Sequence, residues 1–293
     1  MTDLPRDFDR DGLLEYSVVF TDRSLNHMSQ RFQQVMRDIS SNLKQVYNAH
    51  SVTVVPGGGS FGMEAVARQF ATGQHCLVIR NGFFSYRWSQ IFEMGSIPSK
   101  ETVLKASPTS DQPQAPFAPA PIEQVVATIK AEKPAMVFAP HVETASGIIL
   151  PDDYLKQVAD AVHSVGGLFV LDCIASGTIW VDMKAIGVDV LISAPQKGWS
   201  SSPCSALVML SEAADQRLHE TTSTSFACDL RKWRDIMIAY ENGGHAYHAT
   251  MPTDALTGFR DTMMETVERG LETVKAEQWQ LGKAVRALMA AQG

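Results

Sequence analysis

Several short segments of this 293-residue chain hold residue types that can bind an anion, supply a proton or act as a nucleophile. The first is the run Gly57-Gly58-Gly59, which follows an apolar stretch over residues 52–55. Glycines between a strand and a helix leave backbone N–H groups free, and these groups bind a phosphate together with the helix dipole. The alternative interpretation is a tight turn without a ligand. The spacing of Gly57, Gly59 and Gly62 also fits a dinucleotide-binding loop.

A dinucleotide-binding fold needs one more feature that this sequence lacks. It has a carboxylate about 20 positions after the glycine loop, at the end of the second strand. Here that strand is expected over residues 76–79 and is followed by Arg80-Asn81-Gly82, without a carboxylate. The sequence therefore disfavours a nicotinamide dehydrogenase.

A carboxylate and a lysine each follow a later apolar stretch. Asp172 ends the stretch over residues 167–171, and Lys197 comes shortly after the stretch over residues 188–193. Because open α/β sheets bind ligands at the carboxyl ends of their strands, both side chains can reach one crevice. A carboxylate there can keep a pyridine nitrogen protonated, and a desolvated lysine becomes a nucleophile and base. Taken singly, Asp172 could instead cap a turn and Lys197 could be solvated.

Metal binding is not indicated. His245 and His248 are close in sequence, but no further cluster of Cys, His or acidic residues with ligand spacing accompanies them. The four cysteines are scattered without a CxxC pair, so neither a zinc site nor a disulfide framework is expected. The aromatic group around Phe84 follows the second expected strand, where it could pack in the core or stack on a flat ligand.

An α/β framework must position these segments, and the sequence predicts one. Short apolar runs alternate with amphipathic segments along the chain. The proline-rich residues 107–121 are expected to form a surface loop, and residues 253–292 to be almost entirely helical. Helices are also expected over residues 61–72, 122–133 and 152–166. Strands are expected over residues 52–55, 76–79, 135–139, 167–171, 188–193 and 206–210.

The composition is that of a globular protein rather than a disordered or fibrous one. Hydrophobic residues make up 45% of the chain and charged residues 19%. A net charge of −7 repels phosphate backbones, so no nucleic-acid partner is expected. The polar N-terminus has no signal-peptide core, and no stretch is apolar enough to span a bilayer. We therefore expect a cytoplasmic protein without a membrane partner.

Ordered motifs along the chain resemble those of the class V aminotransferases of fold type I, in particular the alanine–glyoxylate, serine–glyoxylate and 2-aminoethylphosphonate–pyruvate group. They are PGGGSFGMEA, RNGFFSYR, HVETASGIILP, LFVLDCIASG, SAPQKGW and YHATMP. The resemblance extends from about Tyr16 to the end of the chain. It implies the large domain of a fold type I pyridoxal-phosphate enzyme, with a mostly parallel sheet flanked by helices. The implied division is an N-terminal arm at residues 1–15, a cofactor-binding domain at 16–252, and a helical connection at 253–293 to a C-terminal domain that is largely absent.

The resemblance also implies roles within a pyridoxal 5'-phosphate site. Lys197 would carry the cofactor as a Schiff base, and Asp172 would bind the pyridinium nitrogen. Phe84 and Ile174 would lie against the two ring faces, and Thr144 near the phenolic oxygen. The neighbouring subunit would share in the phosphate site, which implies a homodimer with shared active sites. The phosphate ligands would be Gly58, Gly59, Ser60 and Gln196 and, from that subunit, Tyr247 and Thr250.

The implied reaction moves an amino group from a small amino acid or aminophosphonate to pyruvate or glyoxylate. Relatives continue into a C-terminal domain with an arginine that clamps the substrate carboxylate, so we expect an intact cofactor site with weak or absent turnover. One alternative is a lyase or desulfurase of the same fold, although neither Cys173 nor Cys204 is placed like a mobile catalytic cysteine. Another is a truncated cofactor-binding protein with little turnover. A non-catalytic binding or assembly module would leave the arrangement of Asp172 and Lys197 unexplained.

Overall fold

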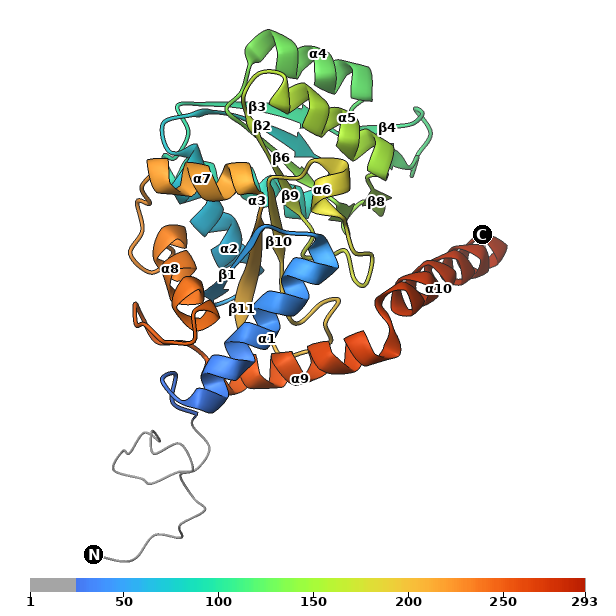
Figure 1. Ribbon diagram of the computed structural model, residues 1–293. Helices are drawn as coiled ribbons and strands as arrows, with labels where there is room; N and C mark the ends of the chain where they lie inside the picture. Colours follow the sequence, from blue (N-terminus) through green and yellow to red (C-terminus); the bar gives the residue numbers. More distant parts are fainter. Residues whose placement is uncertain (1–24, 293) are drawn as a thin grey trace, which may run out of the picture.

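A seven-stranded sheet forms the centre of the chain, with the strand order β1-β11-β10-β9-β6-β2-β3 (Figure 1). The computed structural model describes residues 25–292, so the expected N-terminal arm lies outside the described residues. The strands of this sheet are β1 (Ser51–Pro56), β2 (His75–Arg80), β3 (Lys100–Lys105), β6 (Met136–Pro140), β9 (Leu168–Asp172), β10 (Val190–Ser193) and β11 (Ser205–Leu210).

Strand direction brings the predicted site segments to one edge of this sheet. Only β11 is reversed: it runs antiparallel to both β1 and β10, while the other neighbouring pairs are parallel. The carboxyl ends of all strands except β11 therefore meet at the same edge. Asp172 at the end of β9 lies opposite Ile192 on β10 and Pro140 on β6. The mostly parallel sheet predicted from the sequence is confirmed.

The inner strands explain why sequence patterns located them so well. Every residue of β6, β9, β10 and β11 is buried. A strand covered on both faces consists of a continuous apolar run, and all the expected strands are present within a residue or two. The prediction omitted β3, an edge strand whose sequence KETVLK begins and ends in exposed lysines. Edge strands commonly carry such charges, so they lack the continuous apolar run from which the inner strands were predicted.

Helices cover both faces of the sheet (Figure 1). The connections that contain α2 and α3 lead towards the β3 edge of the sheet, and those that contain α4, α5 and α6 lead back towards the β1 edge. Connections between parallel strands are right-handed, so the two groups of helices lie on opposite faces. Helix α1 packs on β1 and β11, α8 packs on β1 and α1, and α9 packs on α1. The helices are α1 (Gln30–Tyr47), α2 (Gly59–Val66), α3 (Phe83–Gly95), α4 (Ile122–Glu132), α5 (Asp152–His163), α6 (Met183–Ile186), α7 (Glu212–Glu220), α8 (Leu230–Glu241), α9 (Thr253–Arg269) and α10 (Leu271–Gln292).

The expected helices are present with adjusted boundaries. The helix expected at residues 61–72 begins at Gly59, and its last part is a π-helical turn over Ala67–Ala71. The helical stretch expected at 253–292 is divided by Gly270, whose φ of +97° ends α9. The expected loop at 107–121 contains a short hairpin of β4 (Ser107–Pro108) and β5 (Phe117–Ala118). A second short hairpin pairs β7 (Val142–Glu143) with β8 (Ile148–Ile149). No helix within residues 25–292 is long and apolar enough to cross a bilayer.

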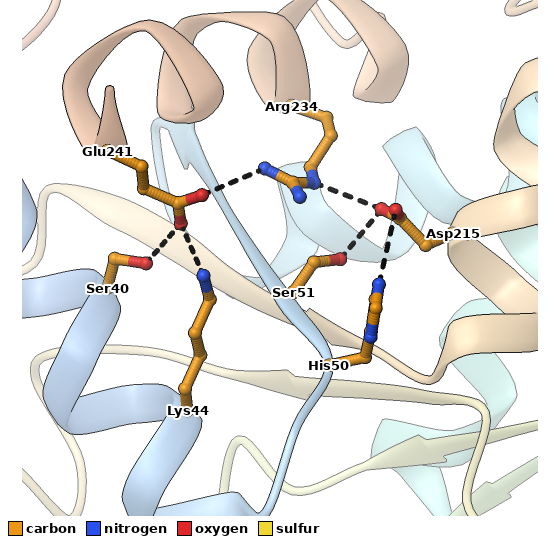
Figure 2. A network of polar contacts seen from close by, with 7 residues as sticks. All are labelled: Ser40, Lys44, His50, Ser51, Asp215, Arg234 and Glu241. Atoms are coloured by element: carbon orange, nitrogen blue, oxygen red, sulfur yellow. Dashed lines mark hydrogen bonds and ion pairs between the residues drawn. The ribbon is translucent and has the colours of Figure 1, made fainter.

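A network of polar contacts ties α1, β1, α7 and α8 together (Figure 2). Arg234 on α8 is buried between two carboxylates, with its Nε 3.0 Å from Asp215 Oδ1 and its Nη1 3.5 Å from Glu241 Oε2. Lys44 Nζ on α1 lies 2.8 Å from Glu241 Oε1. Ser51 on β1 donates a hydrogen bond of 2.7 Å to Asp215. The network therefore fixes α8 against the edge of the sheet that carries β1.

The same contacts keep both carboxylates ionised. Burial alone would raise the pKa of Asp215, but hydrogen bonds from Ser51 and Arg234 outweigh it and hold that pKa below its usual value. Burial alone would also raise the pKa of Glu241, but hydrogen bonds from Lys44 and Ser40 and the charges of Lys44 and Arg234 outweigh it, so that pKa is lowered. A carboxylate with a lowered pKa stabilises the fold above its unfolded pKa, and this contribution is lost as the pH falls through the folded value.

Replacing Arg234 tests the network. Arg234→Met leaves two partly buried carboxylates without their shared cation, so we expect the free energy of unfolding to fall by about 3 kcal/mol at pH 7. Urea unfolding measures the free energy of unfolding of both proteins. The difference between wild type and variant should become smaller below about pH 4, because the carboxylates become protonated. Arg217→Met is the matched control, because Arg217 pairs at 3.4 Å with Glu220 on the surface of α7. Equal losses in the two variants would contradict the assignment.

Candidate functional site

The glycine run forms the turn between β1 and α2 at the carboxyl edge of the sheet. Gly57 has a φ of +118°, which strains an L side chain, and its N–H donates to Cys204 O at 2.9 Å. Gly58 is the extended N-cap residue of α2 and offers no side chain. The first N–H groups of a helix have no acceptor within it, and a Cβ on Gly58 would meet nothing within 4 Å. The loop is thus an open cradle of N–H donors.

Asp172 lies beside this cradle. Its side chain is only 8% exposed, and its Oδ1 accepts the N–H of Ile174 at 2.9 Å. A Cβ on Gly59 would lie 2.5 Å from Ile174 Cδ1, so the glycine loop and the turn after β9 are in direct contact. The structure therefore joins the predicted phosphate loop to the predicted ring-nitrogen partner.

The surroundings of Asp172 disfavour the ionised form of its carboxyl group. Burial raises its pKa to about 6, against the smaller lowering effects of the Ile174 N–H and the charge of Arg87. The charge of Glu143 adds to the rise. A cationic group placed against Asp172 would lower this pKa, because an opposite charge favours the ionised carboxylate.

Lys197 lies in a tight turn after β10. Its C=O accepts the N–H of Ser200 at 3.1 Å, and its side chain is exposed. A Cβ on the next residue, Gly198, would come within 2.0 Å of Gly177 O, so the lysine turn packs on the backbone of the loop that follows Asp172. Beside Lys197, the Oε1 atom of Gln196 is buried without a hydrogen-bond partner in the described part of the chain.

Phe84 is held by a carboxylate that the sequence analysis did not single out. Glu143 on β7 is buried and accepts the backbone N–H groups of Phe84 at 3.1 Å and Ser85 at 2.9 Å. It also accepts the Ser85 hydroxyl at 2.7 Å. An acidic side chain at a helix N-terminus stabilises the helix dipole, so Glu143 fixes the start of α3 beside the segment that carries Thr144. In the sequence, only its position next to Thr144 hints at this contact.

Two more residues near the site were missed. Arg87 on α3 donates a hydrogen bond of 3.0 Å to Ser60 Oγ. His141 follows β6, its backbone N–H donates to Asp172 O at 2.8 Å, and its Nδ1 lies 2.7 Å from Ser176 Oγ. Burial lowers the pKa of His141 to about 4, so this imidazole is neutral at physiological pH.

Most of the predicted site residues lie at the carboxyl edge of the sheet, in loops, at a strand end or in the first turn of a helix. Tyr247 and Thr250 instead lie between α8 and α9, where the Tyr247 side chain is 66% exposed and its ring lies 5.4 Å from that of His27. Within residues 25–292, no hydrogen bond or ring contact joins these two to the other predicted residues. The residues at the carboxyl edge are Gly58, Gly59, Ser60, Phe84, Thr144, Asp172, Ile174, Gln196 and Lys197.

Comparison with known proteins assigns this arrangement to a family. The sequence model of the class-V aminotransferases matches residues 13–292. The chain is 25% identical over 273 residues to an L-aspartate–glyoxylate aminotransferase of Paracoccus denitrificans, covering 92% of this chain and 66% of the relative. An alanine–glyoxylate aminotransferase of Felis catus is 26% identical, with 90% of this chain and 61% of the relative covered. The chain thus spans less than two thirds of the length of these relatives.

The fold also matches solved structures. An alanine–glyoxylate aminotransferase from Nostoc sp. superposes with a TM-score of 0.73 at 23% sequence identity, over 86% of this chain and 64% of that one. The sheet and its flanking helices are therefore those of a fold type I aminotransferase.

The pH dependence of stability, measured on protein prepared without ligands, tests whether the pKa of Asp172 is raised. A raised carboxyl pKa means that the native state binds the proton more tightly than the unfolded state, so this group lowers stability as the pH rises from about 4 to about 6. Asp172→Asn should raise the free energy of unfolding by about 2 kcal/mol at pH 8 and change it little at pH 4. Denaturant unfolding at the two pH values measures the effect. The exposed Asp111→Asn is the control, and destabilisation of Asp172→Asn at pH 8 would refute the assignment.

Proposed function

Because this chain belongs to the class-V aminotransferases, we propose that it binds pyridoxal 5'-phosphate at the carboxyl edge of its sheet and transfers amino groups between amino acids and oxo acids. The observation that carries the proposal is the direct contact of three loops. The turn at Gly59 touches the turn after Asp172, and the Lys197 turn packs on the same segment. These three turns carry an anion cradle, a buried carboxylate and an exposed amine.

The chemistry of the donor set fits this cofactor. The open N–H cradle at Gly58 and Ser60 suits a phosphate, to which the NH2 group of Gln196 could also donate. Asp172, whose burial favours a cationic partner, suits the ring nitrogen. Phe84 and Ile174 would lie against the ring. When bound, pyridoxal phosphate supplies an aldehyde that condenses with amines and a ring that accepts electrons.

Four residues of the chain would have separate roles in binding and catalysis. Lys197 would hold the cofactor covalently and would move the proton at the substrate α-carbon. Asp172 would favour a proton on the ring nitrogen, because a buried carboxylate is stabilised by a cation beside it. Glu143 holds the start of α3, so that Phe84 is presented at a fixed position. Thr144 would bind the phenolic oxygen.

A second copy of the chain would complete the phosphate site. The exposed Tyr247 and Thr250 would reach the phosphate of the neighbouring subunit in a homodimer with shared sites. Residues 16–252 would then be the cofactor-binding domain, and residues 253–293 a helical connection to a C-terminal domain. For substrates we propose a small amino acid as donor and glyoxylate or pyruvate as acceptor, supported by the glyoxylate aminotransferases among the relatives.

Desulfurase chemistry is disfavoured by the cysteines of the region. Burial raises the pKa of both Cys173 and Cys204. Since the thiolate is the nucleophile, neither residue has the lowered pKa of a reactive cysteine.

Replacement of the anchor lysine tests the function. Wild-type protein mixed with pyridoxal phosphate should gain a visible absorbance band that Lys197→Ala lacks. Borohydride reduction followed by peptide mapping should label Lys197 only. Lys184→Ala, on α6 at another place in the fold, serves as the control and should keep the band. The proposal is wrong if Lys197→Ala retains a covalently reducible cofactor, or if the wild type acquires none. Loss of the band on adding alanine or aspartate, and its return with glyoxylate, would identify the substrates.

A further inference from the structure

The proposed phosphate site has no cation among its predicted ligands. Its groups are backbone N–H donors, the Ser60 hydroxyl, the Gln196 amide and the hydroxyls of Tyr247 and Thr250. A phosphate monoester carries close to two negative charges at neutral pH. The N-terminus of α2 offsets only about half of one elementary charge. A cation beside the cradle would balance more of this charge and strengthen the binding of a phosphate monoester.

The structure provides such a group at the right place. Arg87 Nη1 donates a hydrogen bond of 3.0 Å to Ser60 Oγ, at the mouth of the N–H cradle. Arg87 comes three residues after Phe84 on α3, so both side chains lie on one helix face, and the guanidinium is 5.6 Å from the Phe84 ring centroid. The arginine therefore spans the space between the glycine loop and the proposed ring platform.

Arg87 also differs from the structural arginines of the fold. Arg234 and Arg68 have carboxylate partners at 3.0 and 2.7 Å. In the part of the chain that the structure describes, Arg87 has no carboxylate within 4.0 Å, and its contacts are a hydroxyl and an aromatic face. Its charge nevertheless reaches the site, because it lowers the pKa of Asp172. A half-buried guanidinium without an anionic partner, beside an anion cradle, is poised for an anionic ligand.

We propose that Arg87 is the phosphate-binding cation of the site, holding the cofactor phosphate together with Ser60 and the N–H groups of α2. This inference rests on the proposed function. Guanidinium presents N–H donors in a planar fork that matches two phosphate oxygens, which a lysine in the same position would not reproduce. Arg87 would thus discriminate phosphorylated from unphosphorylated pyridoxal. It acts as a binding residue that recognises one end of the cofactor.

Affinity for two ligands that differ only in the phosphate tests the proposal. Dissociation constants of pyridoxal phosphate and pyridoxal are measured by spectral titration for wild type, Arg87→Met and Arg87→Lys. Loss of a charge-assisted hydrogen bond should weaken binding of pyridoxal phosphate by about 10- to 100-fold in Arg87→Met, while pyridoxal binding stays within about 2-fold. Arg87→Lys should fall between the wild type and Arg87→Met. Retained pyridoxal binding also reports that the variant site is folded.

Arg80→Met is the matched control. Arg80 belongs to the same motif and lies 4.8 Å over the Tyr86 ring, but its hydrogen bond is to Ser89 rather than to the glycine loop. It should bind both ligands like the wild type. Unchanged affinity of Arg87→Met for pyridoxal phosphate overturns the inference and leaves the proposed function standing; this is the result expected if Arg87 binds a substrate carboxylate instead. Equal weakening for both ligands also overturns it. A wild type that binds no pyridoxal phosphate overturns the function and the inference together.

Discussion

Direct backbone contact between loops determines how the functional groups of this chain are placed. The turn that carries Lys197 rests on the backbone of the loop after Asp172, because Gly198 leaves no Cβ between them. The glycine loop approaches the same segment from β1, with Gly59 against Ile174. A Cβ on Gly198 would meet backbone atoms of Gly177 and force the two loops apart, whereas a Cβ on Gly59 would first displace the Ile174 side chain. The glycines thus serve close packing as well as ligand access.

Charge is handled differently in the two polar regions of the molecule. Between α1 and α8, each carboxylate of the Arg234 network has cationic and hydroxyl partners, and its charge is balanced within the protein. At the carboxyl edge of the sheet, Asp172 is buried with a raised pKa. There, too, Gln196 has an unpaired amide oxygen and Arg87 a hydroxyl in place of an anion. The carboxylates of the Arg234 network thus have cationic partners within the protein, whereas Asp172 and Arg87 have no ion-pair partner within 4.0 Å in the described part of the chain.

Sequence reasoning located the parts of the site that depend on strand ends. Asp172 and Lys197 follow strands buried on both faces, and such strands leave a continuous apolar signal. Arg87 and Glu143 were missed for a common reason. Each acts through a partner distant in sequence, 27 residues away for Arg87 with Ser60 and 59 for Glu143 with Phe84. No local pattern encodes these contacts, since they depend on how α3 packs beside β7 and α2. The exposed edge strand β3 was hidden by its charges, and Tyr247 and Thr250 were identified through family resemblance alone.

The reversed strand β11 has a consequence for the order of assembly during synthesis. Strand β1 lies at the edge of the sheet and pairs only with β11. Ser51 can therefore form its strand pairing only after Leu210 has been synthesised. At ribosomal rates of about 5–20 residues per second, this interval is roughly 10–30 s. Strands β2, β6 and β9 can pair with one another earlier. The glycine loop after β1 and the Lys197 turn before β11 are therefore brought together in the same late step.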